Sequence, residues 1–340
     1  MDLFEPADNS GILPITYFHA LARLGGEGLI LIEPAQSFVS LGAFDDAASC
    51  LDQDYCRAHG IPVMRRETGG GMVLLGPGQV FYTLVLKRPH ATVPSRVDEA
   101  YRYLSRAPIA VYRQFGITTR LRPINDIVTG EGRKIGGQGA GDINGCFCFV
   151  GSILLDFDTE LMHRVVKLPE EDLRAPLKAT LDEGLTSIRA HTAGRPEPAA
   201  VKRALAQAFA PLLGGLTPRP VPACLLAKAH EVARELSDPQ VVDSEDTKPR
   251  PLFKVREGLY LCQRALATPA GRIIVSLTIQ DDRIRAADMR VVSGTAASVD
   301  LSSLVGRALD RATLLAALPD LSALDVERGP FVAALLGAPT

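Results

Sequence analysis

Two stretches of the sequence combine adjacent glycines with basic residues: "RRETGGG" at 65–71 and "GRKIGGQGAG" at 132–141. Backbone N–H groups in such stretches can surround a phosphate, because no Cβ keeps a polyanion away from the main chain. Neither stretch is a Walker loop or a dinucleotide-binding fingerprint, since the glycines are expected to join strands rather than to open a helix. Charged hairpins would explain one such stretch but explain two poorly. The pattern therefore predicts a site for a phosphate-bearing ligand.

The other reactive residue types form no familiar nucleophile-and-base pair. None of the six histidines lies beside the glycine-rich stretches, which argues against a histidine-based zinc site and a Ser-His triad. The cysteines show no CxxC pair and no Cys/His metal spacing, and in a reducing compartment we interpret them as small buried hydrophobic residues. They are Cys50, Cys56, Cys146, Cys148, Cys224 and Cys262.

Length and charge limit the possible partners. A chain of 340 residues with 46% hydrophobic residues is expected to form two domains with a sizeable core. The net charge of −2 gives no electrostatic reason to expect nucleic acid or an anionic membrane as a partner. The acidic start "MDLFEPADNS" lacks the order of a signal peptide, and Arg23 and Glu27 interrupt the apolar stretch 12–32. We expect a cytoplasmic protein.

The elements around the two stretches are predicted to be strands. Residues 61–86 predict strand, glycine turn, strand, turn, strand, so the first stretch lies between two strands. Alternating apolar residues over 125–158 predict hairpins with a tight loop at 136–145. Helices are predicted at 95–115, 168–190 and 198–213.

A proline-rich segment, "LTPRPVPA" (216–223), is typical of a boundary between domains. We predict one domain over 1–220 and another over 221–340. In the second, a meander of three strands is expected within 252–290, with helices around it. The fold class is α+β.

At this point the chain resembles a known family. "RRETGGGMV" (65–73) and "NDIVTGEGRKIGG" (125–137) resemble the two signatures of lipoate–protein ligases, and "EGLTSIRAHT" (183–192) resembles a third stretch of that family. The likeness covers about 15–212. The later strands are similar to the C-terminal accessory domain of the longer ligases.

The resemblance implies a biotin/lipoate protein ligase-like fold, a mixed β-sheet flanked by helices, with a smaller α+β C-terminal domain. It implies a two-step reaction: lipoate and ATP give lipoyl-AMP, and the lipoyl group then passes to a lysine of an acceptor protein. The implied acceptor is a lipoyl domain, a glycine-cleavage H-like protein or a dedicated lipoate-carrier protein. Mg²⁺ would neutralise the triphosphate.

Residue by residue, the resemblance implies Lys134 as the catalytic residue. In both steps negative charge accumulates on oxygens of one small region, so one fixed ammonium can stabilise both transition states. Asn125 and Asp126 would orient Lys134, or Asp126 would hold Mg²⁺, although a turn-forming Asn-Asp pair explains them nearly as well. The residues implied to bind ATP and lipoyl-AMP are Arg66, Gly69, Gly70, Gly71, Met72, Val73, Leu74, Asn125, Asp126, Lys134, Gly136 and Gly137.

Several positions depart from the family pattern. Leu74, Leu75 and Gly76 stand where an aromatic residue, His and Asp are usual, and "FVGS" (149–152), which includes Val150, replaces a His-Gly-Thr stretch. Gly136, Gly137 and Gln138 replace Ser-Gly-Ser. We expect these changes to alter substrate preference and acceptor choice more than the chemistry.

Two other functions remain open. ATP-independent transferases of octanoyl or lipoyl groups share the implied fold but need a thiolate beside the lysine. In their branch closest to this sequence the cysteine lies just upstream of the lysine loop, where "RLRPINDIVTGEGRK" (120–134) has none; Cys146 and Cys148 lie downstream. A non-catalytic binder of lipoylated protein is disfavoured because Lys134 and Arg66 are retained.

Overall fold

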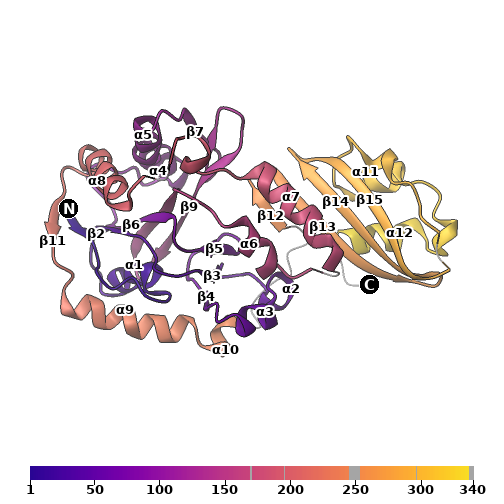
Figure 1. Ribbon diagram of the computed structural model, residues 1–340, viewed down its shortest axis with the longest axis horizontal. Helices are drawn as coiled ribbons and strands as arrows, with labels where there is room; N and C mark the ends of the chain where they lie inside the picture. The colour runs from indigo at the N-terminus through magenta and orange to yellow at the C-terminus, as the bar shows by residue number, and fades with distance from the viewer. Residues whose placement is uncertain (169–170, 195, 245–252, 296, 337–340) are drawn as a thin grey trace.

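The computed structural model describes residues 1–168, 171–194, 196–244, 253–295 and 297–336. A large sheet with helices on both faces forms most of the molecule, and a smaller sheet with its own helices lies beside it (Figure 1). Among the described helices, none combines the length and the apolarity that crossing a bilayer requires.

Within the described residues the main sheet has eight strands, and it is mixed because only β11–β1 and β1–β2 pair in parallel. Strands β6 and β10 are nearly continuous apolar runs, as expected for strands covered on both faces. In sheet order the strands are β11 (Thr217–Arg219), β1 (Asp2–Phe4), β2 (Gly28–Ile32), β6 (Gln79–Lys87), β10 (Cys146–Leu154), β9 (Lys134–Ile143), β8 (Asp126–Thr129) and β7 (Thr119–Arg122).

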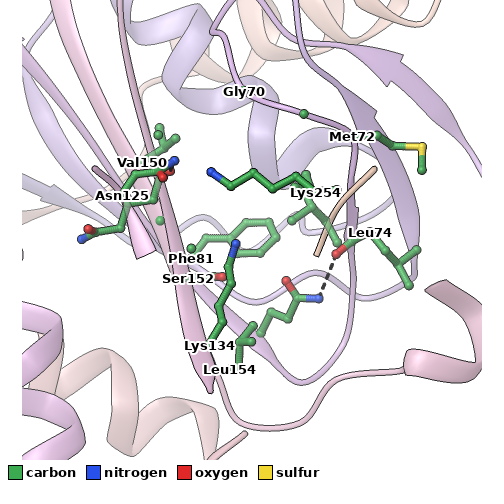
Figure 2. Close-up of a pocket in the computed structure, with 18 of the residues that line it drawn as sticks. Gly70, Met72, Leu74, Phe81, Asn125, Lys134, Val150, Ser152, Leu154 and Lys254 are labelled. Atoms are coloured by element: carbon green, nitrogen blue, oxygen red, sulfur yellow. Dashed lines mark hydrogen bonds between the residues drawn. The ribbon is translucent and has the colours of Figure 1, made fainter. Parts of the chain in front are cut away.

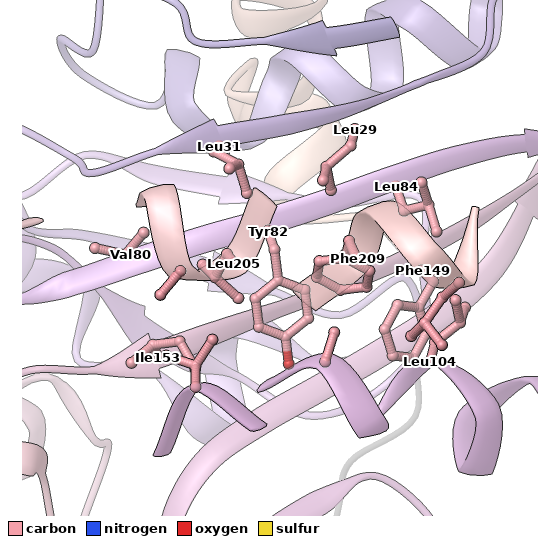
Figure 3. Packing of buried hydrophobic residues seen from close by; sticks show 14 of the residues in the cluster. Leu29, Leu31, Val80, Tyr82, Leu84, Leu104, Phe149, Ile153, Leu205 and Phe209 are labelled. Atoms are coloured by element: carbon pink, nitrogen blue, oxygen red, sulfur yellow. The ribbon is translucent and has the colours of Figure 1, made fainter. Parts of the chain in front are cut away.

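One face of this sheet is covered by α4 (Val97–Leu104), α5 (Arg106–Gln114) and α8 (Pro198–Phe209). Tyr82 of β6 packs there with its ring centroid 5.5 Å from that of Phe209 (Figure 3). The other face is covered by α1 (Leu13–Arg23) and α9 (Ala223–Leu236), which pack on each other and on apolar side chains of β2, β6 and β10. The prediction of a mixed sheet flanked by helices is confirmed.

A three-stranded sheet, β4 (Val63–Arg65), β3 (Phe38–Leu41) and β5 (Val73–Leu75), carries the first glycine-rich stretch between β4 and β5. It packs with several helices of the larger unit, which carries the main sheet, and with the edge of the smaller sheet. These helices are α2 (Ala47–Cys50), α3 (Gln53–Ala58), α6 (Thr159–Val165), α7 (Arg174–Gly184) and α10 (Pro239–Val242), with a 3₁₀ turn at Glu171–Leu173 before α7. Two further 3₁₀ turns, Ile188–Ala190 and Ala210–Leu212, contribute Ile188 and Leu212 to the core on the main sheet.

The prediction of a tight loop at 136–145 was wrong. Lys134–Ile143 form β9, and the reversal is confined to Asn144 and Gly145, both with positive φ (49° and 74°). The segment is a strand because it pairs with β8 and β10, and its glycines leave room for neighbouring atoms that lie where their Cβ atoms would be.

The smaller sheet has four described strands rather than the expected three. A turn at Glu257 and Gly258 divides the first predicted strand into β12 (Phe253–Arg256) and β13 (Leu259–Thr268). The other elements of this unit are β14 (Gly271–Gln280), β15 (Arg283–Gly294), α11 (Arg311–Ala317) and α12 (Arg328–Leu335), with 3₁₀ turns at Ser302–Leu304 and Ser322–Leu324.

The packing of α9 bears on the predicted boundary between residues 220 and 221. Leu225, Val232 and Leu236 of α9 are buried in the core that α1 shares with the main sheet. Arg65 Nε of β4 donates to the carbonyl of Val241 in α10 at 2.8 Å. Helices α9 and α10 therefore pack with the first unit, and the boundary between residues 220 and 221 stays a prediction.

Candidate active site

A cavity of about 310 Å³ lies where the larger unit meets β12, the edge strand of the smaller sheet. Its lining comes from the glycine-rich stretch and β5, from the central strands β6, β9 and β10, and from β12 (Figure 2). Most of the lining side chains are apolar, with a few polar groups. A cavity of this kind is the usual site for a small ligand.

The cavity brings together ten of the twelve predicted binding residues. Asp126 is buried behind Lys134 and does not line it, and Gly136 faces Ser152 and Tyr112 instead. The ten are Arg66, Gly69, Gly70, Gly71, Met72, Val73, Leu74, Asn125, Lys134 and Gly137.

Lys134 is the first residue of β9, and its ammonium extends into the cavity (Figure 2). Its Nζ lies 2.8 Å from Oδ1 of Asp126, whose side chain is only 1% exposed. Its carbonyl accepts a hydrogen bond from the backbone N–H of Thr186 at 2.8 Å, so the third family-like stretch lies beside the lysine. Lys134 is thus held from both its side chain and its main chain.

Asp126 is a carboxylate rather than a neutral acid. Burial alone would raise its pKa, but the Lys134 ammonium and the hydrogen bonds to the carboxylate outweigh burial, so the pKa lies below the usual 3.8. The second hydrogen-bond donor is the backbone N–H of Glu257, from the β12–β13 turn of the smaller sheet. The charged Asp126 carboxylate therefore holds the Lys134 ammonium in a fixed direction.

Both oxygens of Asp126 are therefore occupied, which fits a positioning role better than a magnesium ligand. Among the described residues, no three His, Cys, Asp or Glu side chains gather where they could hold a metal. The nearby Glu257 carboxylate is paired with Lys254 and Tyr260. This donor set does not fit a protein-bound Mg²⁺ at Asp126.

Arg66 organises the glycine-rich stretch from behind. It is 7% exposed, and its guanidinium donates to the carbonyls of Gly69 (2.8 Å), Gly71 (2.8 Å) and Ser40 (2.9 Å). With these carbonyls turned towards the arginine, the loop is held in one shape against β3. The geometry supports a positioning role for Arg66, whereas the sequence suggested a direct phosphate contact.

The departures from the family pattern have structural partners here. Gln138 is buried; it accepts from Ser105 Oγ at 2.9 Å and donates to Tyr82 Oη at 3.1 Å. A Cβ on Gly151 would lie 2.4 Å from the same Tyr82 oxygen. Asn125 donates to the Gln138 carbonyl at 2.7 Å, so it joins β8 to β9 rather than contacting Lys134. Gln138, one of the departures from the family pattern, thus packs as one set with Tyr82 and Gly151.

Sequence reasoning missed Lys254, which lines the cavity from β12 (Figure 2). Its Nζ lies 2.5 Å from Oε2 of Glu257. Phe253 and Val255, its neighbours in the strand, line the cavity as well. No local pattern around residue 254 indicated a site, because its partners lie in the other unit.

None of the six cysteines, all of which the structure describes, lines the cavity. Cys146 and Cys148 are buried under α1, and burial raises the pKa of both thiols, that of Cys148 to about 12. Cys148 pairs with Gly141, seven residues along β9 from Lys134, or roughly 23 Å at the usual rise per residue. These thiols are far from the lysine and poorly ionised.

The sequence profile of the lipoyl protein ligase A/B catalytic domain matches residues 16–210, more than half of the chain. The chain belongs to this family. Its members attach lipoyl or octanoyl groups to proteins, and the predicted family is confirmed. The matched residues include the glycine-rich stretch and Lys134, which line the cavity, and Asp126, which pairs with Lys134.

Relatives within the family carry two different names. The octanoyltransferase LipM of Kyrpidia tusciae is 30% identical over 227 residues, covering 60% of this chain and 81% of that protein. The octanoyltransferase LipM of Geobacillus kaustophilus is 28% identical, covering 44% of this chain and 62% of that protein. The lipoate–protein ligase of Streptococcus pyogenes is 28% identical over 156 residues, covering 46% of this chain and 44% of that protein.

Solved structures confirm the predicted fold. A bipartite lipoate protein ligase of Thermoplasma acidophilum superposes with a TM-score of 0.62 at 21% identity, covering 71% of this chain and 96% of that chain. A lipoate-protein ligase A bound with ATP gives 0.58 at 20% identity, covering 71% of this chain and 98% of that chain. At these identities the likeness establishes the fold alone.

Proposed function

We propose that this protein is an ATP-dependent ligase that joins lipoate, or the related octanoate, to a lysine of an acceptor protein. The observation that carries the proposal is the ammonium of Lys134, held by a buried carboxylate in a largely apolar cavity whose described lining includes no thiol. Such a site can hold an acyl chain and stabilise oxyanions, but it offers no nucleophile of its own. Both nucleophiles must then come from the substrates.

In the first step a carboxylate oxygen of the acyl acid attacks the α-phosphorus of ATP. The bond from that phosphorus to the bridging oxygen breaks, and pyrophosphate leaves with the electron pair. In the second step the acceptor's amine attacks the acyl carbonyl, AMP leaves, and the amine loses a proton to solvent. In this proposal the Lys134 ammonium, which lines the cavity, donates to phosphate and carbonyl oxygens in both steps.

The cavity suits a medium-length acyl chain because Phe81, Val150 and Leu154 form an apolar surface beside Lys134. The archaeal structural neighbour is described with its E2 lipoyl domain, which supports a lipoyl domain as acceptor here. Any magnesium ion would arrive with the ATP triphosphate, since Asp126 is already paired.

The names of the Kyrpidia and Geobacillus relatives favour a second candidate, octanoyl transfer from a carrier protein without ATP. That reaction passes through a cysteine thioester and needs a thiolate within reach of the site. Cys146 and Cys148 are the thiols to test, although their raised pKa values disfavour the thiolate.

The deciding experiment uses purified protein, ATP, Mg²⁺ and lipoate or octanoate, with and without a lipoyl domain. We expect pyrophosphate to be released only when lipoate or octanoate is present, and AMP to be released once the acceptor is added. A Cys146→Ser, Cys148→Ser double variant should keep most of this activity. Transfer from an octanoyl-carrier protein without ATP, with a hydroxylamine-sensitive adduct on either cysteine by intact-protein mass spectrometry, would overturn the ligase in favour of the transferase.

A further inference from the structure

A second ammonium reaches the cavity from a part of the chain 120 positions after Lys134. Lys254 lies on β12, the edge strand of the smaller sheet. Figure 2 shows Lys134 and Lys254 extending into the same space from two sides. About 30% of the Lys254 side chain is exposed, so it is neither fully solvated nor enclosed.

The surroundings of Lys254 hold it in this direction. Oε2 of Glu257 pairs with Lys254 Nζ at 2.5 Å, and Oε1 accepts from Tyr260 Oη at 2.9 Å. The backbone N–H of the same Glu257 donates to Asp126, which pairs with Lys134. One turn of the smaller sheet therefore orients both ammonium groups. An ammonium has three donors and Glu257 takes one, so Lys254 retains donors for a ligand.

We propose that Lys254 binds the pyrophosphate portion of ATP and stabilises it as it leaves. The inference rests on the proposed function, because only a ligase that forms an acyl-adenylate releases pyrophosphate. As the bond from the α-phosphorus to the bridging oxygen breaks, negative charge grows on the leaving pyrophosphate. Lys134 is occupied at the reacting phosphate and carbonyl, and Lys254 supplies the second positive charge in the same cavity.

The two lysines should then act on different steps. Charge develops on pyrophosphate only during acyl-adenylate formation, whereas Lys134 faces oxygens that become charged in both steps. Loss of Lys254 should slow the first step and spare the second. We expect the rate of the first step to fall by at least about tenfold. The fall should be smaller than the roughly 10²–10³ that loss of an enclosed donor costs, because Lys254 is partly solvated.

The test compares Lys254→Met, Lys254→Arg and wild type in the full-length protein. Lipoate-dependent exchange of labelled pyrophosphate into ATP measures the first step, and single-turnover transfer from chemically prepared lipoyl-AMP to a lipoyl domain measures the second. Lys228→Met is the matched control, because Lys228 pairs with Glu231 three residues on, is similarly exposed (26%) and lies outside the cavity. Thermal unfolding verifies that each variant folds.

We expect Lys254→Met to lose exchange, with a higher KM for ATP, and to keep transfer. Lys254→Arg should recover part of the exchange, and Lys228→Met should match wild type. Equal losses in both assays, or no loss in either, would overturn the role of Lys254 while leaving the ligase intact. Absence of exchange in wild type with either lipoate or octanoate would instead overturn the ligase, and the role of Lys254 with it.

Discussion

The two glycine-rich stretches look alike in sequence and serve opposite purposes in the structure. In the loop at 69–71, Gly70 has φ +95° and its neighbours' carbonyls accept from Arg66, so the glycine provides a backbone shape. In β9 the glycines have extended backbone and provide space: a Cβ on Gly137 would lie 3.2 Å from Lys134 Cε. Glycine thus allows a positive φ in the loop at 69–71, whereas in β9 it leaves space for the Lys134 side chain.

If β9 is built around Lys134, removing that ammonium should have the largest effect. Lys134→Met keeps the aliphatic stem, and we expect both half-reactions to fall by about 10²–10³. Pyrophosphate exchange and transfer from supplied lipoyl-AMP measure the two steps separately. Near-normal turnover in either assay, in a variant with unchanged thermal unfolding, would show that Lys134 is not the shared cation.

Changing the loop glycine should have the next largest effect, and it should act through backbone shape. Gly70→Ala forces an alanine to positive φ and brings its Cβ to 2.9 Å from Arg66 Nη2, so we expect a loss of about 1–2 kcal/mol in the free energy of unfolding and weaker nucleotide binding. Gly69→Ala is the matched control, because no atom lies within 4 Å of its Cβ position. Denaturant titrations with equal midpoints for the two variants would contradict a special role for Gly70.

The smallest effect is expected in the strand, where a glycine provides only space. Gly137→Ala should displace Lys134 by a few tenths of an ångström and lower kcat by about threefold, scaled from the 10²-fold cost of a 1 Å misplacement, with little change in stability. Gly130→Ala, which has no neighbour within 4 Å, is the control. A Gly137→Ala variant that unfolds early but keeps its kcat when folded would reverse the contrast between the two stretches.

Local sequence patterns predicted which helices and strands form better than they predicted where strands and domains begin and end. The strands around 61–86 and the helices near 95–115 and 198–213 were expected, and α4, α5 and α8 lie there. Glycine suggested a loop at 136–145, but pairing with β8 and β10 makes residues 134–143 a strand, in which the glycines leave space for Lys134, Tyr112 and Thr68. A Pro-rich segment suggested a boundary at 220, although the buried face of α9 belongs to the first unit.

The sequence by itself predicted the family, which the profile confirmed, and it suggested the lysine that we propose as catalytic and the loop that faces it. Each of these signatures is a short run of neighbouring residues, so it can be recognised without the fold. The chain alone could not reveal that Arg66 serves the loop carbonyls, since that depends on the direction of a guanidinium.

Only the tertiary structure decided what holds and completes the site. Asp126 meets the backbone of Glu257, 131 positions later, and Lys254 enters the cavity from a separate sheet. Contacts of this kind arise from the docking of two folded units, each stabilised by its own core. The periodicity of apolar residues along the sequence indicates which face of an element is buried, but it does not indicate which distant element packs against that face.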